Sequence, residues 1–143
     1  MTSSELENLA KVGQLKREPA SAGEIEGLRR SGEARLADAA KKSLSLESRF
    51  DLAYNAAHAL ALAALRRLGY RSHNRYLVFQ VLPHTLGLPQ ATWRVLAKGH
   101  DTRNLAEYEG AIDVDERLVI DMIEAANAVQ TALRAAEPSK SGE

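Results

Sequence analysis

The sequence predicts an all-α protein, an up-and-down bundle of four to five helices. Alanine and leucine dominate its apolar residues, it has only 4 prolines, and runs of β-branched residues are few. Most segments repeat apolar residues at the three-to-four-residue spacing of an amphipathic helix. At 143 residues the chain can form one domain with a sizeable core and is too short for two ordinary domains.

The composition excludes several classes of protein. The 19 basic and 19 acidic residues balance, so the chain lacks the basic excess of a dedicated nucleic-acid-binding protein. It has no cysteine, which excludes disulfides, thiolate metal sites and cysteine nucleophiles. The first residues lack the layout of a signal peptide, and the uncharged run at residues 52–65 is too short and too polar to cross a bilayer. We therefore expect a cytoplasmic protein with no membrane segment and no cofactor.

The chain divides into three expected parts. Residues 1–20 hold a short helix, at residues 2–12, and a linker in which Pro19 disfavours helix. Residues 21–136 form the helical-bundle domain, and the polar residues 137–143 form a disordered tail.

The first long helix of the domain is expected at residues 22–42, with Ser21 as its cap. Glu26 and Arg30 have the spacing of a stabilising i,i+4 ion pair. Gly32 weakens the helix intrinsically but permits a second helix to approach closely.

A central helix is expected at residues 46–68, from the cap Ser45 to the stop at Gly69. Its uncharged run indicates that neighbours surround it on most sides. Asn55 and His58 lie one turn apart in this run. We interpret them as core side chains that are hydrogen-bonded to neighbouring helices, with a polar pocket as the alternative.

Five basic residues follow within ten positions. They are interpreted as a helix C-terminus and a solvated loop, with a basic binding patch as the alternative. These residues are Arg66, Arg67, Arg71, His73 and Arg75.

The second half of the chain predicts three more helices. Residues 74–82 could form a buried strand, but a single strand would have no partner, so a helix that Pro83 ends or kinks is expected. The next helix starts with Pro89 and ends near residue 110, unless Gly99 splits it.

The last helix is expected at residues 114–136, with a capping box that starts at Asp113. Its apolar stripe, which Ile120 and Ile123 widen, is broad enough to contact more than one neighbour. This width favours a homodimer.

The best functional candidate is the polar stretch at residues 100–110. His100, Asn104 and Tyr108 continue a helical stripe that is apolar before them, and Arg103 lies beside it at helical spacing from His100 and Glu107. Polar groups that face a bundle must be satisfied, which indicates a site. The alternative is a helix end that turns its side chains into solvent.

Other catalytic motifs are missing. The four histidines show no metal-ligand spacing, no glycine loop could cradle a phosphate, and no serine lies in a nucleophile-elbow context.

Over residues 21–136 the chain resembles the HEPN superfamily of small helical-bundle proteins. The resemblance rests on the order of the helices, on the Ala-rich central helix, and on an Arg103-Asn104 pair that is followed by Tyr108 and then by a long last helix. The resemblance implies a HEPN-like fold and a homodimer. In that superfamily a histidine follows the arginine, and many active members are metal-independent endoribonucleases whose sites form at a dimer interface. This chain has Tyr108 at the position of the histidine, and a phenol with a pKa of about 10 is a poor base near neutral pH.

The departure at Tyr108 leads to three expectations. The first is a HEPN-like module, degenerate at the nuclease motif, that acts as a toxin-antitoxin-type component or binds a partner, by resemblance a nucleotidyltransferase-like protein. The second is a metal-independent endoribonuclease that cleaves RNA with Arg103 and either His100 or Tyr108. The third is a purely structural dimerisation protein. The candidate catalytic residues are Arg103, Asn104, Tyr108 and His100.

Overall fold

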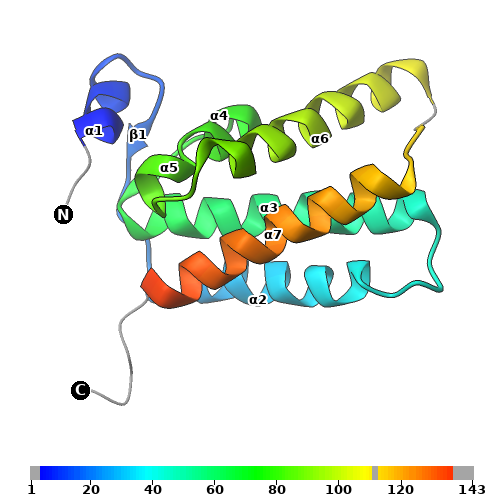
Figure 1. Ribbon diagram of the computed structural model, residues 1–143. Coiled ribbons are helices and arrows are strands. Elements are labelled where there is room, and N and C mark those ends of the chain that lie inside the picture. Colours follow the sequence, from blue (N-terminus) through cyan, green and yellow to red (C-terminus); the bar gives the residue numbers. More distant parts are fainter. Residues whose placement is uncertain (1–3, 111–112, 137–143) are drawn as a thin grey trace.

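The computed structural model of the protein describes residues 4–110 and 113–136. In this part of the chain, helices make up all the regular structure apart from one pair of two-residue strands, so the all-α prediction is confirmed. The elements are α1 (Ser4–Lys11), β1 (Lys16–Arg17), α2 (Ala22–Ala39), α3 (Leu46–Arg67), β2 (Tyr70–Arg71), α4 (Arg75–Gln80), α5 (Leu82–Thr85), α6 (Gln90–Glu109) and α7 (Glu116–Ala136) (Figure 1). The start expected at residue 2 and the disordered tail at 137–143 fall outside the described residues.

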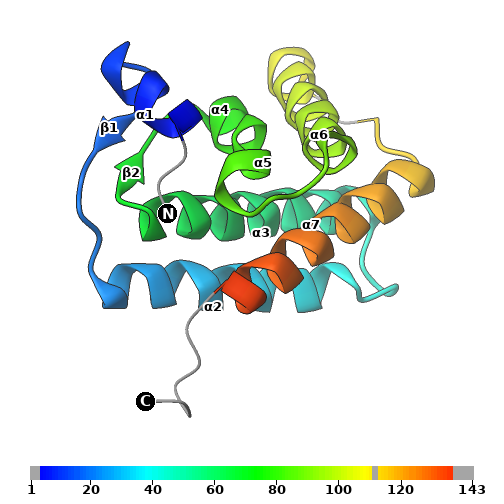
Figure 2. The ribbon, with the colours of Figure 1, turned by 60° about the vertical axis from the view of Figure 1, so that its left-hand side comes forward.

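Helix α3 is the centre of the fold. Helix α2 lies along one side of it, while α4, α5 and α6 cover the other side and α7 crosses α3 next to α2 (Figure 2). Most of its apolar side chains are fully buried, among them Phe50, Leu60 and Leu65. The helix ends where Gly69 adopts a φ of 88°, which a residue with a side chain rarely does.

The hairpin of α2 and α3 depends on caps and on one close approach. Ser21 and Ser45 cap the two helices as predicted, each hydroxyl accepting a backbone N–H bond of 3.1 Å. A Cβ at Gly32 would lie 2.6 Å from Cγ of Leu60, so this glycine brings the two helices together. Helix α2 ends at Ala39, three residues before the expected end. Arg49 donates a 2.8 Å hydrogen bond to the carbonyl oxygen of Ala39.

The basic cluster at residues 66–75 begins at a helix C-terminus, as predicted, with Arg66 and Arg67 in the last turn of α3. The expectation of a solvated loop after it is corrected, because Arg66 and Arg71 form an ion-pair network with partly exposed carboxylates. The side chain of Arg66 is only 1% exposed, and its Nε lies 2.8 Å from a carboxylate oxygen of Glu24. The antiparallel pairing of β1 with β2, which was not predicted, brings Glu18 to Arg71, at 2.5 Å. The hydrogen bond from Arg71 lowers the pKa of Glu18, and the one from Arg66 lowers the pKa of Glu24.

The segment at residues 74–82 is helical, as predicted, but it forms parts of two short helices. The amide oxygen of Asn74 caps α4 by accepting the Leu77 N–H at 3.2 Å. The break falls at Val81, and Pro83 then lies in the first turn of α5.

Helix α6 runs unbroken to Glu109, so the split considered at Gly99 is wrong. A Cβ at Gly99 would lie 2.5 Å from the sulfur of Met122, which shows that this glycine serves the contact between α6 and α7. Pro89 precedes the first residue of α6 rather than being that residue. Gly110 ends the helix with a φ of 78°.

The cap of α7 also differs from the prediction. Asp115, and not Asp113, accepts the Leu118 N–H, at 2.8 Å, so the helix starts at Glu116. The buried stripe is confirmed at Met122, Ala125, Val129 and Leu133. No helix in the described part of the chain is long and apolar enough to cross a membrane.

Candidate functional site

The polar site is built around Tyr54, a fully buried residue in the first half of α3. Its hydroxyl oxygen lies 2.9 Å from Nδ1 of His100 on α6, and the two rings are stacked with centroids 6.2 Å apart. The edge of Tyr76 from α4 packs against the same imidazole, at 6.0 Å between centroids. His100 is therefore held between α3 and α4 rather than free on a helix surface.

Asn104 makes the second hydrogen bond to His100. Its amide nitrogen lies 3.1 Å from Nε2 of the imidazole. With this amide as donor, Nε2 is an acceptor, so a neutral imidazole carries its proton on Nδ1 and donates it to the Tyr54 oxygen. In this arrangement the acceptor nitrogen of His100, Nε2, faces the side chain of Asn104. Asn104 itself is exposed.

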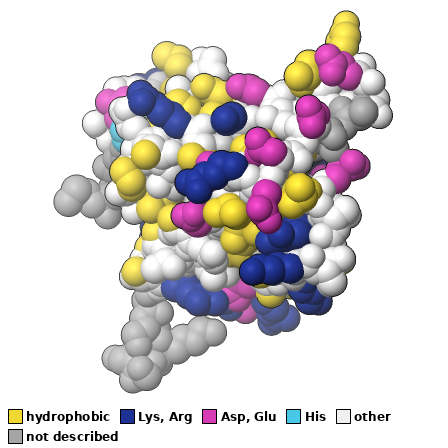
Figure 3. Space-filling model, turned by 45° about the vertical axis from the view of Figure 1, so that its right-hand side comes forward, with side chains coloured by type: hydrophobic (Ala, Val, Ile, Leu, Met, Phe, Trp, Pro, Cys, Tyr) yellow, Lys and Arg dark blue, Asp and Glu magenta, His cyan; other side chains and the backbone are white. Residues whose placement is uncertain are grey.

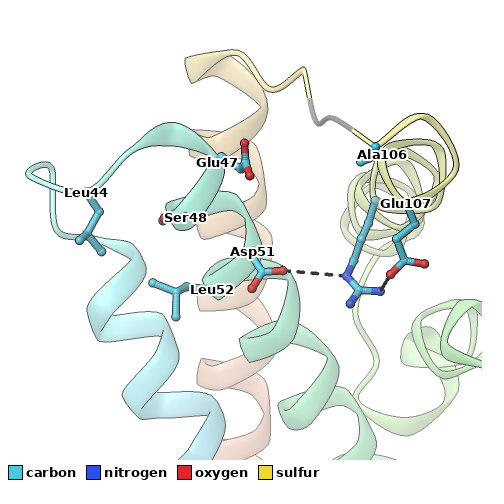
Figure 4. A pocket seen from close by; sticks show the side chains of 9 residues that line it. Leu44, Glu47, Ser48, Asp51, Leu52, Ala106 and Glu107 are labelled. Carbon is cyan, nitrogen blue, oxygen red and sulfur yellow. Dashed lines mark ion pairs between the residues drawn. The ribbon is translucent and has the colours of Figure 1, made fainter.

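Arg103 lies beside Tyr54, but carboxylates already bind its charge. The guanidinium carbon is 5.1 Å from the centroid of the Tyr54 ring, a cation–π distance. Glu107 lies 3.0 Å from Nη1, and Asp51 of α3 lies 3.9 Å from Nε (Figure 4). Arg103 therefore acts as a bridge between α6 and α3.

Tyr108 takes no part in this cluster, which corrects the expectation that it would converge with the other three residues. Its side chain is 93% exposed. Tyr108 follows Arg103 by five residues. At about 100° of rotation per residue, its side chain points about 140° around the axis of α6 from that of Arg103. In addition, the last turns of α6 diverge from α3 (Figure 1).

Tyr54 was missed as a site residue by the sequence analysis, and its neighbours Asn55, His58 and Arg75 were considered for the site only in alternative interpretations. Arg75 donates a 3.3 Å hydrogen bond to the amide oxygen of Asn55, and its guanidinium carbon lies 5.7 Å from the centroid of the Tyr54 ring. His58 is partly buried with its ring edge-on to Phe79. The signal was present in the helical spacing of Tyr54 and His58, which places both on the face of α3 toward α6.

His58 has a strongly perturbed acidity. Its pKa is lowered from 6.5 to about 4, first by burial and then by the positive charges of Arg75, His100 and Arg103. It is therefore neutral at physiological pH. The leading interpretation holds for Asn55, whose amide is hydrogen-bonded to Arg75 of the neighbouring α4. His58 instead contacts a neighbouring helix through its ring, which is edge-on to Phe79 of α4.

A groove of about 730 Å³ lies next to Arg103, between the first turns of α3 and the last turns of α6. Its apolar lining comes from Leu44, Leu52 and Ala106, and its carboxylates come from Glu47, Asp51 and Glu107 (Figure 4). We call it the α3–α6 groove.

Among the residues that the structure describes, no group of three or more His, Cys, Asp or Glu side chains could hold a metal ion. Comparison with protein families, with curated proteins and with solved structures finds no match to this chain.

Proposed function

We propose that the protein is a HEPN-like helical module, degenerate at the nuclease motif, that acts by binding a partner protein as a component of a toxin-antitoxin-type system. One observation carries the proposal. Arg103 is ion-paired to Glu107 and Asp51, whereas Tyr108, at the position of the superfamily histidine, is turned into solvent. A guanidinium that already pairs with carboxylates is less available to a phosphate, and an exposed phenol is a poor base near neutral pH.

Two exposed side chains at the end of α6 support a homodimer whose interface lies away from His100 and Arg103. Leu105 and Tyr108 are 57% and 93% exposed and lie one turn apart on the last turns of α6. At about 100° per residue they face away from Ala106 and Glu107, which line the α3–α6 groove. A large apolar side chain and an aromatic ring that are this exposed are typical of a surface that a second subunit covers.

The test of the partner-binding proposal is co-expression with the product of a small adjacent reading frame. We expect the two proteins to purify together. We also expect that this chain, when it is expressed, does not cleave RNA. Failure of any neighbouring product to co-purify would count against the proposal. Light scattering tests the dimer separately: Tyr108→Ala should shift the mass toward the monomer, while Thr131→Ala, at an exposed position of α7, should not.

A metal-independent endoribonuclease is the second candidate, and the position of His100 favours it. In such a reaction Nε2 of His100 would accept the proton of the 2′-hydroxyl, and Arg103 would stabilise the charge that develops on phosphorus. For this role the Asn104 amide, which lies 3.1 Å from Nε2, would have to turn away so that Nε2 can accept the proton. The geometry supports His100 over Tyr108 as the base.

Cleavage of a mixed RNA pool in excess chelator separates the two candidates. The nuclease predicts that wild type cleaves and that both Arg103→Ala and His100→Ala lose the activity. Arg94→Ala on the same helix is the matched control, because Arg94 is exposed and its side chain bonds only to that of Gln90 among the described residues. Equal products from all four proteins would indicate a contaminant and leave the partner-binding proposal in place.

A further inference from the structure

We propose that the α3–α6 groove is a docking site for a basic amphipathic helix of a partner protein. The inference rests on the partner-binding function proposed above and adds to it the location of the contact and the chemistry of the partner. Three features of the groove carry it, namely its apolar lining, its charge and the inability of a second copy to fill it.

The apolar lining suits the nonpolar stripe of a helix. Leu44, just before α3, is 37% exposed, and Leu52 and Ala106 are partly buried. Figure 4 shows Leu44 and Leu52 beside each other on one side of α3 and Ala106 on α6 at its other side. An amphipathic helix laid across the first turns of α3 would cover these side chains, as helix-in-groove recognition does. The volume of about 730 Å³ holds several large side chains.

The charge of the groove selects a basic partner. Its lining carries the carboxylates of Glu47, Asp51 and Glu107 against one cation, Arg103, which leaves two negative charges uncompensated. No basic side chain among the described residues forms an ion pair with Glu47, so this carboxylate remains available to a cation. The negative end of the α6 dipole, at Gly110, and the positive end of the α3 dipole, at the first turn that holds Glu47, oppose each other, so the excess charge comes from the carboxylates. In the view of Figure 3, acidic side chains lie beside hydrophobic ones on the projecting part of the molecule, and Lys and Arg gather on the lower part.

A second copy of this chain fits the groove poorly. Most dimers are symmetric, so the same patch would meet itself and Glu47 would face carboxylates across the two-fold axis. Like charges that face each other at an interface cost several kcal/mol. A phosphate backbone is disfavoured for the same electrostatic reason. A positively charged helix is the occupant that relieves the excess charge and covers the apolar walls together.

The test uses a pair of synthetic helices of about 15 residues, the length at which an isolated helix becomes stable in water. One carries leucines at helical spacing with lysines elsewhere, and the other has glutamates in place of the lysines. We expect the Leu/Lys helix to bind the full-length protein, with amide NMR shifts concentrated at Leu44, Leu52 and Ala106. The Leu/Glu helix should not bind.

The variant that decides the matter is Glu47→Lys, because Glu47 is exposed and no ion pair among the described residues depends on it. We expect it to weaken binding of the Leu/Lys helix about tenfold or more. Glu124→Lys, which changes an exposed carboxylate on α7, is the control and should bind like wild type. Equal weakening by both variants, or shifts away from the groove, would overturn the proposal.

Two further outcomes keep this proposal apart from the partner-binding function. If a natural partner co-purifies equally well with wild type and with Glu47→Lys, the groove proposal fails and the partner-binding function stands. If no natural partner exists but the Leu/Lys helix binds as described, the function fails and the groove is still a site for basic helices. A change in the mass of the protein alone on Glu47→Lys would assign the groove to self-association and overturn the proposal.

Discussion

Replacing His58 by glutamine should remove an acid-sensitive part of the stability of this protein. The imidazole lies in a partly buried position on α3, near the charges of Arg75, His100 and Arg103, and burial is the largest cause of its lowered pKa. Glutamine has a similar volume and remains polar, but it does not titrate. The difference between the two proteins as a function of pH therefore reports the protonation of His58.

The magnitude follows from the shift of the pKa. The folded state has a pKa of about 4 against an ordinary 6.5, so between these values the unfolded chain binds the proton more tightly and stability falls as the pH falls. At about 1.4 kcal/mol per pH unit, wild type should lose about 3 kcal/mol below pH 4 through this group, and about 2 kcal/mol of it by pH 5. Above pH 7 the contribution is constant.

The assay is urea unfolding of wild type and His58→Gln at steps between pH 8 and pH 4. We expect the free energies of unfolding to keep a constant difference above pH 7 and then to diverge, with wild type losing more. Carboxylates with lowered pKa, such as Glu18 and Glu24, affect both proteins alike and cancel. Parallel profiles, or an NMR titration of His58 with a midpoint near 6.5, would show that burial does not hold this imidazole neutral.

Two further predictions concern packing and buried charge. Gly32→Ala should lower the free energy of unfolding by about 1–3 kcal/mol, because the new Cβ would lie 2.6 Å from the side chain of Leu60. Gly27→Ala should raise the free energy of unfolding by up to about 1 kcal/mol, because its new Cβ would meet no atom within 4 Å. Equal effects in urea unfolding would contradict the close approach. Arg66→Ala should cost about 3 kcal/mol, since it removes a buried guanidinium that donates to the carbonyl oxygens of Glu18, Pro19 and Tyr70 and to the carboxylate of Glu24. The exposed Arg30→Ala should cost less than about 1 kcal/mol. A small loss for Arg66→Ala in thermal or urea unfolding would show that water replaces the guanidinium.

Much of the candidate site could be read from spacing along α6. His100, Arg103 and Asn104 do lie together, and Arg103 does reach Glu107, because a helix brings residues three and four apart onto one face. Tyr108 has similar spacing but projects into solvent. Spacing reports the side of a helix and not whether another helix lies opposite.

The partners of these residues on other helices could not be read from the sequence. Tyr54 and His100 are 46 positions apart, and only the packing of α6 against α3 brings the hydroxyl within 2.9 Å of the imidazole. Arg66 and Glu24 are 42 positions apart, and a run of basic residues gave no sign that one of them is buried. Charge patterns along a chain do not specify which charges tertiary packing pairs.

Local patterns along the chain were enough to predict the helices and most of their ends. Ser21 and Ser45 cap the starts of α2 and α3, and Gly69 and Gly110 follow the ends of α3 and α6. Apolar residues recur along the chain at the helical period. The packing of the helices was needed to establish which polar side chains are buried, which carboxylates neutralise Arg103, and where a groove remains open between α3 and α6. Those properties depend on the distances between helices, which no local pattern in the chain encodes.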